Sequence, residues 1–144
     1  MSASGLKVFD ETLHLTNSWL KDMMEMLHTD DRQFAYRALR AVLHALRDEL
    51  EPELAVHLAA ELPMLVRGFY YEGWQPSRTP MPNRHLEGFY QAIQAEMQGY
   101  PEPDPGRLAA AVFDLLATRI ATGEVQKVAR SLPRAIRDLW GIPS

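Results

Sequence analysis

The 144-residue sequence contains no cysteine, which excludes a disulfide scaffold, a thiolate zinc site, an iron–sulfur cluster and a cysteine nucleophile. Its eight glycines are dispersed, so they form neither a phosphate-cradling loop nor a dinucleotide-binding fingerprint. An excess of positive charge is also absent: the net charge is −4, whereas nucleic-acid binding depends on clustered cations that release counterions. The sequence therefore predicts a protein without a cofactor or metal, and makes nucleic acid an improbable partner.

Long hydrophobic runs are absent as well. The segment Leu108–Leu116 has low polarity, but Arg107, Asp114 and Arg119 interrupt it well short of the ~20 apolar residues of a membrane span. The first ten residues lack the apolar stretch of a secretory signal. We therefore expect a cytoplasmic protein with no membrane partner, folded as one domain over residues 1–144.

Apolar residues recur every three or four positions over residues 8–28, which predicts an amphipathic helix. Two further side chains, Trp19 and Met26, widen its apolar stripe. The stripe itself consists of Phe9, Leu13, Thr16, Leu20, Met23 and Leu27.

Three more helices are predicted in the first half. Asp30 and Asp31 offer carboxylates that can cap the second helix. Pro52 and Pro63 suit the starts of the third and fourth helices, because the amide hydrogen that proline lacks would have no partner in a first turn. The apolar face of the second helix comprises Tyr36, Leu39, Val42, Leu43, Leu46 and Leu50.

Residues 73–83 contain three prolines and are predicted to form a linker in extended or turn conformation. The same order of elements then returns. Helical spacing predicts helices over residues 86–97 and 108–120, Thr122 is expected to cap a third helix, and Pro133 to open a fourth.

An internal repeat underlies this return. When the sequence is aligned with itself at an offset of 70 residues, apolar positions align with apolar positions and no gap is needed. Trp19, for example, aligns with Phe89. The step Leu62–Pro63 aligns with Leu132–Pro133, and Arg67 aligns with Arg137. We therefore predict an all-α fold with two similar units of about four helices each, residues 6–72 and 84–142, packed as a pseudo-symmetric bundle.

Two longer strings carry a family resemblance. AYRALRAVLHALRD at residues 35–48 and LPMLVRGFYYEGW at residues 62–74 resemble the bacterial family called domain of unknown function 2267. The resemblance extends over nearly the whole chain. It implies a small, bacterial, all-helical protein, and it implies no catalytic or ligand-binding residue.

Four basic or titratable residues follow one line of the second predicted helix: Arg37, Arg40, His44 and Arg47. Such a line could hold phosphate groups, because guanidinium groups match phosphate oxygens in pairs. Alternatively, it is a solvated face whose arginines pair with neighbouring acids and cover the edge of the core. In the second repeat Ala110 replaces the second arginine, so the line belongs to one half only.

A dense aromatic run follows Arg67. Tyr70, Tyr71 and Trp74 are of the kind that anchors protein interfaces, because they bury large areas at low entropic cost. The alternative is that these rings close the core at the end of the fourth helix. We take Arg67, these three aromatics and the basic line together as the candidate interaction surface.

No catalytic arrangement is evident. Glu53, His57 and Glu61 share one helix face, but a metal would need a further ligand from another helix. No serine lies in a nucleophile elbow. The sequence therefore predicts a non-enzymatic interaction or regulatory module that binds a protein partner or itself, with an anion or nucleic-acid binder that uses Arg37, Arg40 and Arg47 as the alternative.

Overall fold

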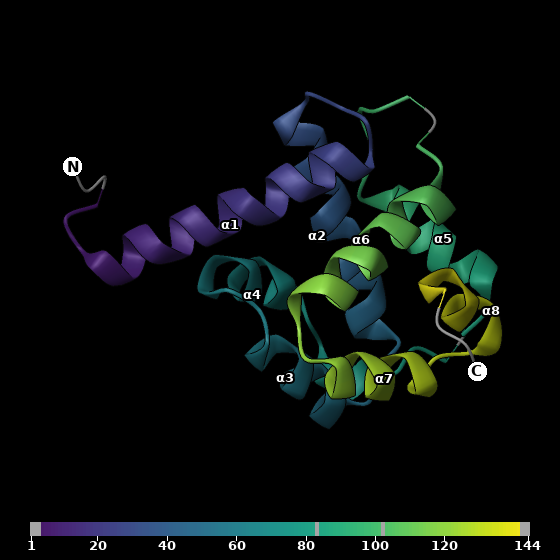
Figure 1. Cartoon of the computed structure of the whole chain (residues 1–144). Coiled ribbons are helices and arrows are strands. Elements are labelled where there is room, and N and C mark those ends of the chain that lie inside the picture. The colour runs from purple at the N-terminus through teal and green to yellow at the C-terminus, as the bar shows by residue number, and fades with distance from the viewer. Residues whose placement is uncertain (1–3, 83, 102, 142–144) are drawn as a thin grey trace.

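The prediction of an all-α fold is confirmed by a computed structural model, which describes residues 4–82, 84–101 and 103–141 (Figure 1). Within these residues the chain forms helices and turns and no strand. The helices are α1 (Lys7–Met26), α2 (Arg32–Asp48), α3 (Pro52–Ala60), α4 (Met64–Tyr71), α5 (Leu86–Ala95), α6 (Pro105–Arg119), α7 (Thr122–Ser131) and α8 (Arg134–Arg137), with short 3₁₀ turns η1 (Pro76–Arg78) and η2 (Asp138–Trp140).

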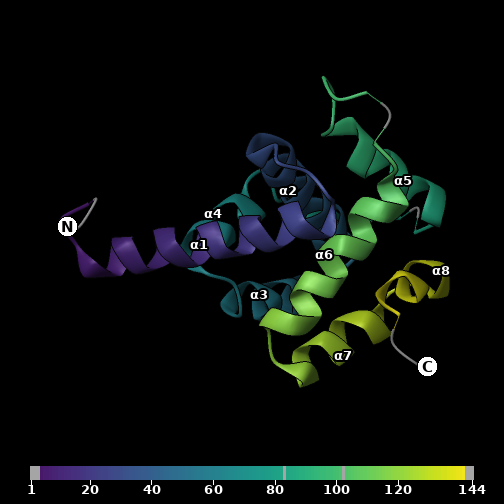
Figure 2. The same cartoon turned by 45° about the horizontal axis from the view of Figure 1, so that its top comes forward.

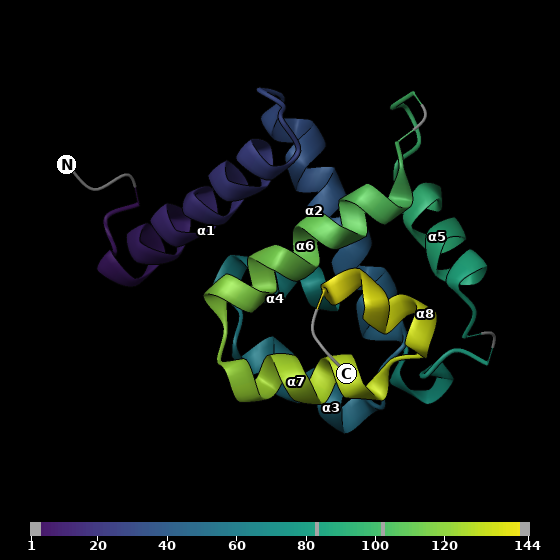
Figure 3. The ribbon, with the colours of Figure 1, turned by 45° about the vertical axis from the view of Figure 1, so that its right-hand side comes forward.

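Helix α2 lies at the centre of the molecule. It contacts α1, α4, α5 and α6, which surround it in two views (Figures 1 and 3). As expected, an aspartate caps it: the Asp31 carboxylate accepts the Phe34 amide at 3.0 Å. Because neighbours cover α2 on several sides, even polar positions near its end, His44 and Arg47, are buried.

Helix α1 forms as predicted, but its apolar stripe is covered over only part of its length. Thr16 and the apolar side chains that follow it are buried, whereas Phe9 is 46% exposed and Leu13 is 39% exposed. The first turns of α1 project past the body of the molecule (Figures 1 and 2). The stripe is therefore covered only from Thr16 onwards, because the helix is longer than the surface that covers it.

The predicted prolines lie at the starts of helices, some as the first helical residue and some as the residue just before it. Pro52 is the first residue of α3, while Pro63 and Pro133 occupy the cap positions just before α4 and α8. The prediction that Thr122 caps α7 is wrong. Ala121 is the cap residue, and its amide donates to Oε1 of Glu61 at 3.0 Å, so the acceptor comes from the other half of the chain.

Several features recur at the offset of 70 residues. Trp19 and Phe89 are both buried, as are Tyr70 and Trp140. Contacts between helices come in corresponding sets: α1 packs on α2 and α6, and α5 packs on α6 and α2. Such reciprocity is expected of two units related by a twofold axis, and the pseudo-symmetric packing stays a prediction.

No helix of the described residues is both long enough and apolar enough to cross a membrane.

Candidate functional site

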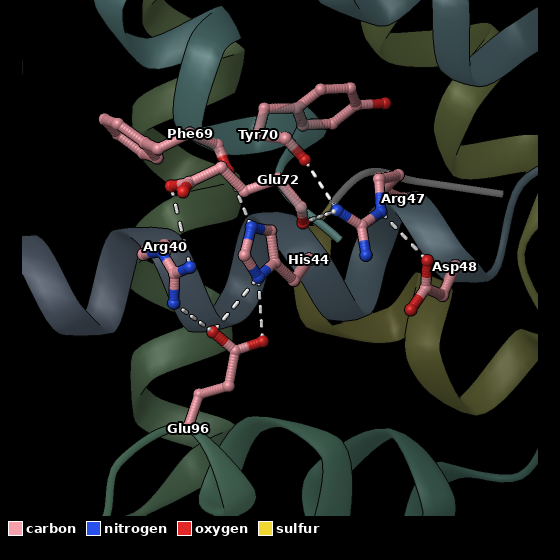
Figure 4. A network of polar contacts seen from close by, with 8 residues as sticks. All are labelled: Arg40, His44, Arg47, Asp48, Phe69, Tyr70, Glu72 and Glu96. Carbon is pink, nitrogen blue, oxygen red and sulfur yellow. Dashed lines mark hydrogen bonds and ion pairs between the residues drawn. The ribbon is translucent and has the colours of Figure 1, made fainter. Parts of the chain in front are cut away.

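The basic line of α2 meets the ends of two other helices (Figure 4). Arg40, His44 and Arg47 lie on successive turns of α2, so their side chains leave it on one side. The last turn of α4 crosses this side with its carbonyl groups directed toward α2, and Glu96, directly after α5, approaches from the opposite direction. The site therefore joins three helices.

Arg47 binds the carboxyl end of α4. Its Nη1 donates to the carbonyl oxygens of Tyr70 at 2.7 Å and Glu72 at 2.9 Å, and its Nε donates to Oδ1 of Asp48 at 2.9 Å. These carbonyls have no partner within their own helix, and they carry the negative end of its dipole. A buried guanidinium therefore supplies both the hydrogen bonds and the charge that this helix end requires.

His44 connects the same helix end to α5. Its Nε2 lies 2.6 Å from the carbonyl oxygen of Phe69, and its Nδ1 lies 2.8 Å from Oε2 of Glu96. Because a carbonyl only accepts hydrogen bonds, Nε2 carries a proton. Arg40 donates to Oε1 of the same Glu96 at 2.9 Å and lies 3.6 Å from the carboxylate of Glu72, so it bridges two carboxylates that follow different helices.

Neither prediction for the basic line describes all of its members. The prediction of a solvated face is wrong for His44 and Arg47, which are 5% and 4% exposed. Arg40 is half-buried and already paired with carboxylates. Arg37 is separate from the network, with its guanidinium 6.0 Å from the ring of Tyr100. The geometry thus leaves little of the line available to an anion.

Other arginines bind helix ends in the same way. Arg67 donates to the carbonyls of Ala59 and Leu62 at 2.9 Å each, at the end of α3. Arg107 donates to Leu27 after α1, at 2.7 Å. The remaining two are Arg84, on Glu49 after α2 and Ser131 in α7, and Arg137, on Ala129, Arg130 and Leu132 at the end of α7. Several of the positively charged side chains thus hold helix ends together within the fold.

The aromatic run mostly closes the core. Tyr70 is fully buried, its hydroxyl donates to the carbonyl of Ala55 at 2.8 Å, and burial raises the pKa of that hydroxyl well above its usual range. Tyr71 and Trp74 are half-buried and pack on each other, with ring centroids 5.4 Å apart. Tyr70 is therefore unavailable to a partner.

A hollow of about 410 Å³ opens beside the network. It is lined by Arg40, His44, Arg47, Glu72, Gly73 and Glu96. Acid–base catalysis would require a ring nitrogen of His44 to reach a substrate, and here each nitrogen already faces a protein oxygen. The arrangement is suited to holding helices together.

The possible metal site on α3 does not assemble. Glu53, His57 and Glu61 are all exposed. No three metal-binding side chains gather closely enough to hold an ion in the part of the chain that the structure describes. Glu61 instead receives the amide of Ala121.

Sequence reasoning named Asp48 as a neighbouring acid of the basic line but missed Glu72 and Glu96. Glu96 follows His44 by 52 residues, and helical spacing relates only residues within one helix. The carbonyls that Arg47 binds carry no sequence signal, because every residue has one. A histidine flanked by arginines was the available signal, and it did not identify their partners.

A family model described as an uncharacterized conserved protein (DUF2267) matches residues 16–139. No curated protein matches the chain.

Proposed function

Because the chain belongs to the DUF2267 family, whose description names no activity, we propose a function from its own surface: the protein is a non-enzymatic module that self-associates through the projecting part of α1. The proposal includes a bacterial cytoplasmic location, which agrees with a sequence that has no cysteine for disulfides.

The observation that carries this proposal is a set of large apolar side chains left uncovered at one end of one helix. We call this set the free α1 face. Its five members are between 39% and 52% exposed: Leu6, Val8, Phe9, Leu13 and Leu15. Single exposed apolar residues are ordinary, whereas several of them within the first turns of one helix are typical of interaction sites. Val8 and Leu15 lie across the covered line of α1 from the other three.

The geometry of α1 supports a helical partner. Leu6, Phe9 and Leu13 follow each other at steps of three and four on one side of the line that the body covers. Thr12 lies on that covered line, where its hydroxyl oxygen accepts the amide of Leu65 in α4 at 3.3 Å. A ridge with this spacing packs well against another helix.

A second copy of the chain is the partner that these features favour. None of the five side chains is charged, so their burial against a second copy takes no charge of their own out of water. Together they expose on the order of 400 Å² of apolar surface. A standard interface buries ~800 Å² per partner and is ~60% apolar, so the free α1 face comes close to the apolar share that a symmetric dimer needs.

Light scattering coupled to size-exclusion chromatography tests this. We expect the full-length protein to be a dimer at micromolar to 100 µM concentration. The double substitution Phe9→Glu and Leu13→Glu should make it monomeric, because dimerisation would then bury four carboxylates without partners. Its helical circular dichroism should be unchanged, because both side chains are exposed.

Val56→Glu provides the matched control. Val56 is 46% exposed on α3, so it receives the same change of charge outside the free α1 face. This variant should remain a dimer. A wild-type protein that is monomeric at 100 µM, or a dimer that survives the double substitution, would contradict the proposal.

A further inference from the structure

A small cavity lies between α2 and α5, and Asp48 of the network described above forms part of its wall. Its volume is about 230 Å³. Ala45, Gly88 and Ala92 leave this space open, because their side chains are too small to fill the gap between the two helices. The complete lining is Ala45, Asp48, Glu49, Met81, Gly88, Phe89 and Ala92.

Two carboxylates line this otherwise apolar space, and they differ in their partners. Asp48 accepts a hydrogen bond from Nε of Arg47 at 2.9 Å. Glu49 is only 5% exposed, and its Oε1 has no hydrogen-bond partner within the described residues. The nearby Arg84 donates instead to the backbone carbonyls of Glu49 and Ser131. Glu49 is thus a buried acid that lacks a directly bonded cation.

Such a group is costly to the fold. Burial raises the pKa of Glu49 to about 7; the charge of Arg84 opposes this shift and that of Asp48 adds to it. A buried polar group without a partner destabilises the folded state, so its persistence at the wall of a cavity indicates a ligand that supplies the partner.

We propose that this cavity binds a small primary amine, with its ammonium group on the Glu49 carboxylate and its apolar body against Ala45, Phe89 and Ala92. The ammonium group provides both the positive charge and the hydrogen-bond donors that Glu49 lacks. The apolar body matches the rest of the lining. A cavity of 150 Å³ can hold a benzene ring, so a ring with a short amine-bearing arm fits the volume here.

Other ligand classes fit less well. An anion would meet two carboxylates. A metal ion would require at least a third protein ligand, and the described residues offer no such group. The cavity is separate from the free α1 face, so amine binding does not depend on self-association.

Benzylamine is the probe that tests the proposal, with benzyl alcohol as its uncharged counterpart. Titrations of the full-length protein at pH 8, followed by calorimetry and by amide chemical shifts, should show saturable benzylamine binding in the millimolar range or tighter. Benzyl alcohol should bind at least tenfold more weakly. The shifted amides should be those of the α2 and α5 residues around the cavity.

Two substitutions locate the site. Glu49→Gln should weaken benzylamine binding at least tenfold without loss of helicity, because the shape is kept and the charge is removed. Ala92→Leu should block binding by filling the cavity, and an exposed Ala92 tolerates the larger side chain. Glu53→Gln removes an exposed acid from α3 and is the control for net charge; it should bind as the wild type does.

The proposal is overturned if benzylamine shows no saturation at tens of millimolar, if benzyl alcohol binds equally well, or if Glu49→Gln binds with unchanged affinity. None of these results depends on the oligomeric state. Amine binding can therefore fail while the proposed self-association stands, and self-association can fail while amine binding stands.

Discussion

Individual buried charges in this protein differ in how completely they are compensated. Arg47 is 4% exposed, and its Nε and Nη1 donate to three oxygens at 2.7 to 2.9 Å. Glu49, two residues later, is equally buried, and its Oε1 has no partner among the described residues. A paired buried charge is tolerated because its hydrogen bonds replace those it made to water, whereas an unpaired one tends to take up or release a proton.

Glu49 therefore makes stability depend on pH. Its pKa is raised to about 7 in the folded protein, whereas an unfolded glutamate has its ordinary pKa near 4.5. Between these values the folded state holds a proton that the unfolded state has lost, so the free energy of unfolding falls as pH rises from about 4.5 to about 7. We expect Glu49→Gln to unfold like the wild type at pH 4 and to be more stable by roughly 3 kcal/mol at pH 8.

Urea unfolding at a series of pH values from 4 to 8 measures this difference. Glu53→Gln, which removes an exposed acid, is the control and should follow the wild type at each pH. A difference between Glu49→Gln and the wild type that stays constant over the series would contradict the assignment.

At the scale of the element, the most informative unit is a short helix followed by a Leu-Pro step and an arginine. Arg67 in α4 donates to the carbonyls of Ala59, Ala60 and Leu62 at the end of α3. Arg137 in α8 makes the corresponding bonds, each partner exactly one repeat offset later in the chain, at the end of α7. Leucine fills the core, proline ends one helix and starts the next, and arginine holds the two together.

If the halves are equivalent, Arg67→Met and Arg137→Met should destabilise the protein by similar amounts. Methionine keeps the apolar stem and removes the hydrogen bonds, so each substitution should cost about 2 kcal/mol. The double variant should lose the sum within ~0.5 kcal/mol, because the two clamps share no partner. Denaturant unfolding provides the measurement.

Arg130→Met is the control for this pair. Its side chain is exposed at the end of α7, so the change should stay within ~0.5 kcal/mol. A large loss for one clamp residue and none for the other would show that the two steps are alike in sequence without being equivalent in the fold.

At the scale of the whole molecule, the distribution of charge favours protein partners over nucleic acid. The net charge is −4, and five arginines bind helix ends within the fold. We expect no saturable binding of short RNA or DNA at physiological salt in fluorescence anisotropy. The double substitution Arg37→Gln and Arg40→Gln should leave the anisotropy signal unchanged. Binding that weakens steeply with salt and is lost in this double variant would support the basic line as a nucleic-acid surface instead.

The free α1 face also becomes visible only at this scale. Phe9 and Leu13 continue the same periodic pattern as Leu20 and Met23, yet the first two are exposed and the last two are buried. The pattern reports which side of a helix is apolar. Whether that side is covered depends on how far the neighbouring helices extend, and here they do not reach the N-terminal turns of α1.

The sequence by itself determined the helices, because apolar spacing, prolines and a capping aspartate act within a few residues of one another. It also determined the family and the alignment of the two Leu-Pro steps. Only the tertiary structure decided that His44 and Arg47 are buried, that Glu96 is their partner and that Glu49 borders a cavity. These outcomes depend on which distant segments meet, and a local pattern carries no information about the side chain that arrives from another helix.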